Sequence, residues 1–117
     1  MRVVHDPADG PAKTLATDVE VADSLFGKAR GLMGREHVPE DYALVFPFRR
    51  AASRSVHMLF VRTDIDVLWT VDDRVQHVET LPAWRGTGRA RADRIVELAP
   101  GAADAVEAGD VVRVESD

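Results

Sequence analysis

The sequence contains no cysteine, and this absence excludes disulfide bonds, thiolate zinc sites and cysteine nucleophiles. Long apolar runs are also missing. The longest, around residues 56–61, is far shorter than the roughly 20 residues that cross a bilayer as a helix. The N-terminal MRVVHDPADGPAK lacks the apolar core of a secretory signal. We therefore expect a cytoplasmic protein with no membrane span.

The sequence has fewer basic residues than acidic residues. Fifteen Lys and Arg stand against twenty Asp and Glu, which gives a formal net charge of −5. The average surface therefore repels phosphate, and this predicts no nucleic-acid partner. The 117 residues are 45% hydrophobic and 30% charged, as in a soluble globular protein. We expect a single domain over residues 1–117, with residues 1–14 peripheral to it.

Short apolar or alternating runs, separated by turn residues, recur along the chain. They predict strands at residues 2–5, 15–21, 42–47, 55–61, 65–71, 75–81, 94–98 and 111–115. In the strand 65–71, Ile65, Val67 and Trp69 share one face, whereas Asp66 and Leu68 share the other. The tripeptide DDR that follows predicts a hairpin to the next strand.

Helical spacing is confined to two segments. Apolar residues three and four apart predict a helix at residues 24–33, and PGAADAVEAGD predicts helical turns at residues 102–108 that end by Gly109. Residues 49–54 are polar and Ala-rich, and residues 82–93 contain two glycines, so we expect both segments to be loops. Together these patterns predict a mainly β fold, a small single-domain β-sandwich or barrel with one or two short helices.

Several motifs resemble those of one known family in order and spacing. KARGLMGRE, ALVFPF, SVHMLFVRTDIDVLWTVDDRV and VELAPGAADAVEAGDVV are similar to motifs of the "domain of unknown function 192" group. The resemblance covers about residues 19–114 and implies a compact, mainly β domain with no established activity. Six residues carry over by position: Arg30, Gly31, Leu32, Met33, Met58 and Asp66. Where the family has Trp-Met-Lys-Asn, this chain has His-Met-Leu-Phe, which lacks the Lys and the Asn.

Two polar residues within apolar runs are the first site candidates. Asp66 is expected either to accept backbone N–H groups or to pair with Arg54 or Arg62, and its alternative role is to anchor a ligand. His57 is flanked by apolar residues, a setting typical of a hydrogen-bonded core histidine. The alternative is that His57 and Asp66 form an acid/base pair.

Trp84 is the third candidate, together with its neighbour Arg85. An aromatic ring beside Arg in a loop is typical of a recognition surface, and a tryptophan that caps the end of a barrel is equally common. The nearby GTGRAR lacks the pattern of a phosphate-binding loop. No serine has the context of a hydrolase nucleophile.

These observations favour a non-catalytic module that binds a small ligand, a glycan or another protein through Asp66, Trp84, Arg85 and His57. The sequence shows no catalytic motif, no metal-ligand set and no cofactor motif. The alternative is an enzyme that uses Asp66 and His57. The two differ in geometry, because an enzyme needs both side chains within hydrogen-bonding reach in an open cleft.

Overall fold

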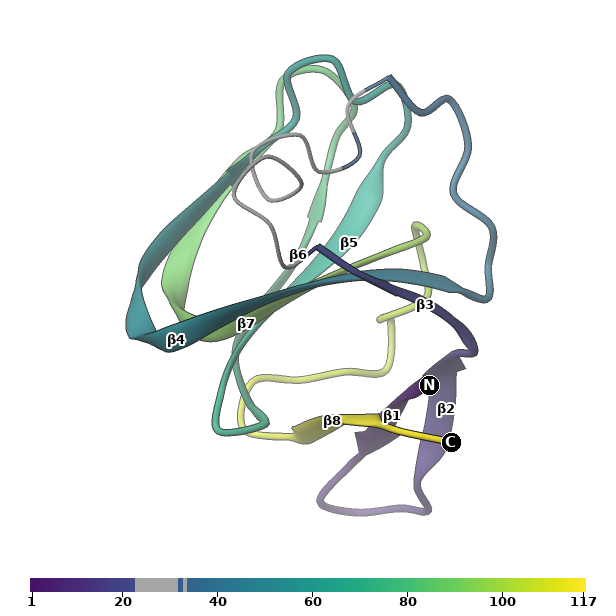
Figure 1. The fold of residues 1–117 in the computed structure, drawn as a ribbon, viewed down its shortest axis with the longest axis vertical. Helices are drawn as coiled ribbons and strands as arrows, with labels where there is room; N and C mark the ends of the chain where they lie inside the picture. Colours follow the sequence, from purple (N-terminus) through teal and green to yellow (C-terminus); the bar gives the residue numbers. More distant parts are fainter. Residues whose placement is uncertain (23–31, 33) are drawn as a thin grey trace.

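Eight β-strands form the regular structure in a computed structural model, which describes residues 1–22, 32 and 34–117. The strands are β1 (Arg2–Asp6), β2 (Lys13–Ala16), β3 (Asp18–Val21), β4 (Tyr42–His57), β5 (Ile65–Val71), β6 (Arg74–Leu81), β7 (Thr87–Leu98) and β8 (Val111–Glu115). They belong to one sheet in the order β2-β1-β8-β6-β5-β7-β4-β3. Figure 1 shows β1, β2 and β8 together with both chain ends at one side of the molecule.

The sheet is open and mixed. The pair β3–β4 is parallel, whereas the other strand pairs are antiparallel. The prediction of a single, mainly β domain is confirmed. The finer prediction of a β-sandwich or barrel is replaced by one open sheet, because all eight strands belong to a single sheet and its edge strands β2 and β3 do not pair with each other.

The two edge strands come from one predicted strand, at residues 15–21. The chain breaks it at Thr17, where the N–H groups of Thr17 and Asp18 both donate to the carbonyl of Asp41 at 2.9 Å. This contact moves the chain from one edge of the sheet to the other, which an alternating sequence alone does not reveal.

The hairpin between β5 and β6 has the predicted position. Its turn residues Asp72 and Asp73 have φ values of 50° and 68°, as in the two-residue turns whose twist matches that of paired strands. The predicted faces of β5 are also confirmed. Ile65, Val67 and Trp69 lie in one core cluster, and Leu68 lies in the other.

The longest strands, β4 and β7, correct two predicted loops. Residues 49–54 lie within β4, and β7 begins at Thr87, inside the predicted loop 82–93. The strand does not stop at Pro47 either. Pro47 pairs with Arg94 and Ala52 with Ala92, so a bulge absorbs the proline and β4 continues to His57.

We call the paired residues 52–57 and 87–92 the β4–β7 arm. Figure 1 shows the two strands side by side along one flank of the molecule. Trp69 anchors the arm to the core, because its indole N–H donates to the carbonyl of Arg54 at 3.0 Å. A Cβ at Gly88 would lie 2.7 Å from the Trp69 ring, so glycine is required for this contact.

The second predicted helix is absent. Residues 100–105 form turns, held by i→i−3 bonds such as Asp104 N–H to Gly101 C=O at 3.1 Å and Val106 N–H to Ala103 C=O at 2.9 Å. Gly101 and Gly109, which flank this segment, both have positive φ, at 91° and 96°, and so lie outside helical geometry. The first predicted helix, at residues 24–33, lies outside the described residues except for Leu32.

Two apolar clusters hold the sheet together, one on each face. The first surrounds Trp69 and includes Leu44, Phe46, Val56, Met58, Ile65, Val67, Leu81, Ile95 and Ala99. The second includes Val3, Val45, Leu68, Val75, Val96, Leu98, Ala103, Val106 and Val112. The central strands β4, β5 and β7 are thus buried on both faces, which explains their nearly continuous apolar runs.

Candidate functional site

Two adjacent turns close the end of the β4–β7 arm. One turn follows β4, where Val61 N–H donates to the Met58 carbonyl at 2.9 Å. The other precedes β7, and two backbone bonds join them: Trp84 N–H to Val61 C=O and Met58 N–H to Gly86 C=O, both 2.9 Å. We call the exposed side chains of these turns, Leu59, Phe60 and Trp84, the aromatic tip.

The backbone of the aromatic tip is strained. Phe60 has a φ of 64° and Trp84 a φ of 69°, values that are outliers for bulky residues and unfavourable by about 1–3 kcal/mol each. Gly86 tightens the second turn, because a Cβ there would lie 2.8 Å from the Pro82 carbonyl oxygen. The strain presents two aromatic rings to solvent from neighbouring turns.

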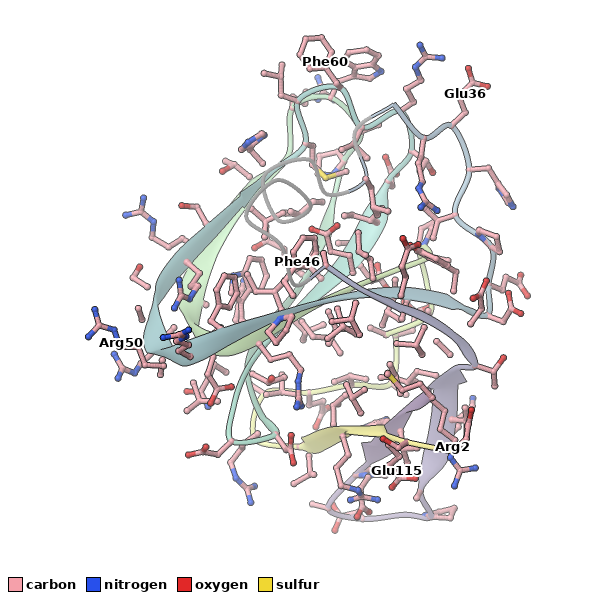
Figure 2. All side chains as sticks on the ribbon, in the orientation of Figure 1. Arg2, Glu36, Phe46, Arg50, Phe60 and Glu115 are labelled. Carbon is pink, nitrogen blue, oxygen red and sulfur yellow. The ribbon has the colours of Figure 1, made fainter. Side chains whose placement is uncertain are left out.

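The rings of the aromatic tip are in contact and exposed. Phe60 and Trp84 meet edge to face, with centroids 6.0 Å apart and an interplanar angle of 70°. About half of each side chain is accessible, 50% for Phe60, 50% for Trp84 and 52% for Leu59. In Figure 2, Phe60 projects from one extremity of the molecule, and the ring contact places Trp84 beside it.

The other residues at this end are polar. Arg85 follows Trp84, and His57 ends β4 opposite Thr87. The side chains of His57, Trp84 and Arg85 are all exposed. The structure therefore brings His57, Trp84 and Arg85 to the same end of the molecule. The prediction that His57 is a hydrogen-bonded core residue is wrong, because β4 ends at His57 and its side chain faces solvent.

Asp66 lies at the start of β5, and only 2% of it is exposed. Its Oδ2 accepts the N–H groups of Gly101 at 3.0 Å and Ala103 at 2.9 Å, and its Oδ1 accepts the Thr80 hydroxyl at 2.7 Å. This confirms that Asp66 accepts backbone N–H groups. The carboxylate pins the turn after β7 to the start of β5.

The two arginines considered as partners of Asp66 have other contacts. Arg54 donates to the carbonyls of Arg50 and Ala92, and Arg62 pairs with Glu36. His57 makes no hydrogen bond to Asp66, whose acceptor atoms are already occupied. The geometry gives no support to an acid/base pair. Among the described residues no group of three or more His, Asp or Glu could hold a metal ion.

Glu97 on β7 is a buried carboxyl that was not among the residues predicted from the sequence. Only 5% of Glu97 is exposed, and burial raises the pKa of its carboxyl to about 8. Its cross-strand neighbours are Leu44 on β4 and Val67 on β5. The available signal was a single acidic residue within the apolar run RIVEL.

Tyr42, the first residue of β4, is a second group with a raised pKa. Its hydroxyl donates to Glu20 at 2.7 Å, and the Arg35 guanidinium lies 4.8 Å from the ring centroid. Burial, together with the Glu20 bond, raises the pKa of Tyr42 above its usual value. Neither this group nor Glu97 adjoins the aromatic tip in sequence or in strand register.

The fold and tip define a class: a small domain of one open, curled β-sheet that presents strained aromatic residues at the end of a two-stranded arm. The model of the domain of unknown function 192 family, described as an uncharacterized ACR, matches residues 8–114. The chain belongs to this family.

Two curated relatives carry the name UPF0127 protein. The Thermococcus kodakarensis protein is 36% identical over 81 residues, which cover 68% of this chain and 52% of the relative. The Thermococcus gammatolerans protein is 38% identical over 69 residues, covering 57% and 44%. The chain thus matches about half the length of these relatives.

Two solved structures share the fold. A proposed transcription regulator from Sinorhizobium meliloti superposes with a TM-score of 0.84 at 22% identity, covering 96% of this chain and 91% of that one. A Novosphingobium aromaticivorans protein of unknown function gives a TM-score of 0.84 at 19% identity, covering 97% and 84%. At these identities the likeness concerns the fold alone. In the described part of this chain, no helix is long and apolar enough to cross a membrane.

Proposed function

We propose that the protein is a non-catalytic binding module whose recognition surface is the aromatic tip, with Arg85 and His57 beside it. One observation carries the proposal: Phe60 and Trp84 hold positive φ values while half of each side chain stays in water. Neither the strain nor the exposure stabilises the fold. Such features persist where they serve recognition.

The nature of the side chains supports the same assignment. Tryptophan and arginine are enriched among the residues that dominate binding energy, and a rigid aromatic ring loses little entropy when a partner covers it. Asp66 contributes indirectly in this proposal. By fixing the turn at Gly101 and Ala103 it holds the scaffold, and it does not touch the partner.

The test is to remove the strain. Phe60→Gly and Trp84→Gly place a residue that tolerates positive φ at each strained position. If the rings serve binding, each variant should unfold at a urea concentration equal to or above that of the parent. A loss of more than about 2 kcal/mol in either variant would show that the rings hold the fold together.

A matched control calibrates this comparison. Phe46 has the same side chain as Phe60 but lies in the core, with 5% exposed. Phe46→Gly should reduce stability by about 4 kcal/mol or more, because it leaves a cavity in the first core cluster. The difference between Phe46→Gly and Phe60→Gly therefore separates a packing residue from a recognition residue.

A further inference from the structure

The charges of the chain are segregated along the sequence. Residues 42–63 and 80–92 contain no Asp or Glu, although the chain has twenty. The same two segments contain seven of the fifteen basic residues: Arg49, Arg50, Arg54, Arg62, Arg85, Arg89 and Arg91. These segments are the β4–β7 arm, the bulge beside it and the turns of the aromatic tip. The most basic part of the protein therefore coincides with the proposed recognition surface.

The register of the arm places two of these arginines on its solvent face. Arg91 lies opposite Ser53, and Arg89 lies opposite Ser55. All four residues are exposed, and the intervening positions of both strands face the other way. We call this row of Arg89, Arg91, Ser53 and Ser55 the arginine ladder.

The cations of the ladder form no ion pair within the part of the chain that the structure describes. Arg89 has one weak contact, 3.5 Å to the Ser55 hydroxyl. Arg49 and Arg91 form no ion pair with a described acidic residue. Figure 2 shows the Arg50 side chain at the bulge, at the far end of the arm from Phe60. The arm thus presents the exposed guanidinium groups of Arg89 and Arg91, unpaired with any described acidic residue, in a line that ends at two exposed rings.

This arrangement fits one ligand chemistry. Side chains two residues apart on a strand lie about 6.7 Å apart, so successive ladder cations can follow an extended chain of phosphates. Proteins that bind single-stranded nucleic acid combine such a cationic track with aromatic rings on which bases stack. We propose that the arginine ladder and the aromatic tip bind single-stranded nucleic acid, with phosphates along Arg89 and Arg91 and a base against Trp84 or Phe60.

The inference rests on the proposed function and names its ligand class. A membrane surface fits the layout less well, because membrane-binding tips need their cations around the inserted rings. Here Arg85 lies beside the rings, but Arg89 and Arg91 extend along the arm away from the tip, and Arg50 at the bulge lies far from Phe60 (Figure 2). The prediction of no nucleic-acid partner rested on the average charge, from which the arm departs.

The test is fluorescence anisotropy with a labelled oligodeoxythymidylate of about 15 nucleotides, a length within the range that one single-strand binding domain covers. If Arg49, Arg50, Arg89 and Arg91 each meet a phosphate, the logarithm of the association constant should fall with the logarithm of salt with a slope of about −3. Affinity should then drop about 50-fold between roughly 50 and 200 mM salt.

Two double variants test the ladder. Arg89→Ser with Arg91→Ser should weaken binding at least tenfold and reduce the salt slope by about 1.4. The control, Arg2→Ser with Arg74→Ser, removes the same charge from β1 and β6, and it should change affinity less than threefold. Equal losses in the two pairs would overturn the proposal, because binding would then follow net charge alone.

Trp84→Leu tests base stacking. The variant keeps an apolar side chain but removes the ring, so oligonucleotide affinity should fall about tenfold or more.

A membrane surface is the alternative ligand, and vesicle binding tests it. Vesicles of phosphatidylcholine with about 30% phosphatidylserine should not bind the parent at physiological salt. Vesicle binding without oligonucleotide binding would overturn the nucleic-acid proposal but leave the aromatic tip as a recognition surface. Destabilisation by Phe60→Gly and Trp84→Gly would instead remove the recognition surface itself.

Discussion

The buried carboxyl of Glu97 predicts an unusual dependence of stability on pH. In the unfolded chain a glutamate has a pKa near its ordinary value of 4.5, whereas burial raises the pKa to about 8 in the fold. The folded state therefore binds more protons than the unfolded state between these two values, and stability falls as pH rises through this window. Below the unfolded-state pKa both states are protonated, and the contribution of Glu97 is fully retained.

The surroundings of Glu97 explain the direction of the shift. Leu44 and Val67 flank it across the sheet. In the same transverse row, the next ionisable groups are Glu79 beyond Val67 and Glu20 beyond Leu44. Both are acidic, so neither offers the positive charge that would favour ionised Glu97. Desolvation is the cause, and it acts against the charged form.

The magnitude follows from linkage. With a pKa near 4.5 unfolded and about 8 folded, the parent should lose about 2 kcal/mol of unfolding free energy between roughly pH 6 and pH 8. Glu97→Gln has nearly the same size and no ionisable group, so it should lack this loss. The parent and the variant should therefore diverge by about 2 kcal/mol over that range.

Urea unfolding at several pH values measures this divergence. Glu107→Gln is the matched control, since it removes the same charge from an exposed position, and it should keep the pH dependence of the parent. The reasoning would be refuted if the parent and Glu97→Gln lost stability in parallel, because Glu97 would then ionise in the fold as it does in water.

Three further predictions concern residues that the sequence singled out. Asp66→Ala should reduce stability by about 3 kcal/mol or more in urea, because it leaves the buried N–H groups of Gly101 and Ala103 without acceptors; a neutral effect would contradict the structural role. His57→Leu should change stability by less than about 0.5 kcal/mol, since the imidazole is exposed, and a larger loss would place His57 in the core. EDTA should leave the melting temperature unchanged, and a decrease reversed by added metal would reveal a missed site.

The sequence was informative where a strand is buried on both faces or ends in a distinctive turn. The faces of β5 and the hairpin at Asp72 and Asp73 were predicted, because apolar alternation and turn residues record them directly. The sequence was misleading for the β4–β7 arm. Its outer face is exposed and carries Arg and Ser, and its inner face carries Ala and needs Gly88 to approach Trp69. These residues are typical of loops, and only the partner strand makes them β.

The turn after β7 was mispredicted for a different reason. The segment from Ala102 to Ala108 has good helix formers, but the Asp66 carboxylate binds the N–H groups of Gly101 and Ala103. The carboxylate that fixes the start of this turn lies 35 positions away in the sequence, and no local pattern reports such a contact. For Asp66 itself, burial and backbone partners were predictable from a lone carboxylate in an apolar strand.

The net charge of −5 hides an uneven distribution of charge along the chain. Removing the seven arginines of residues 42–63 and 80–92 from a chain of net charge −5 leaves −12 on the remainder. The body of the protein therefore repels an anionic polymer, whereas the arm attracts it. Both effects act in the same sense, since they orient an approaching anion toward the arm and away from the β1–β8 end. An acidic protein can thus bind an anion at one surface, provided that the basic residues are gathered there.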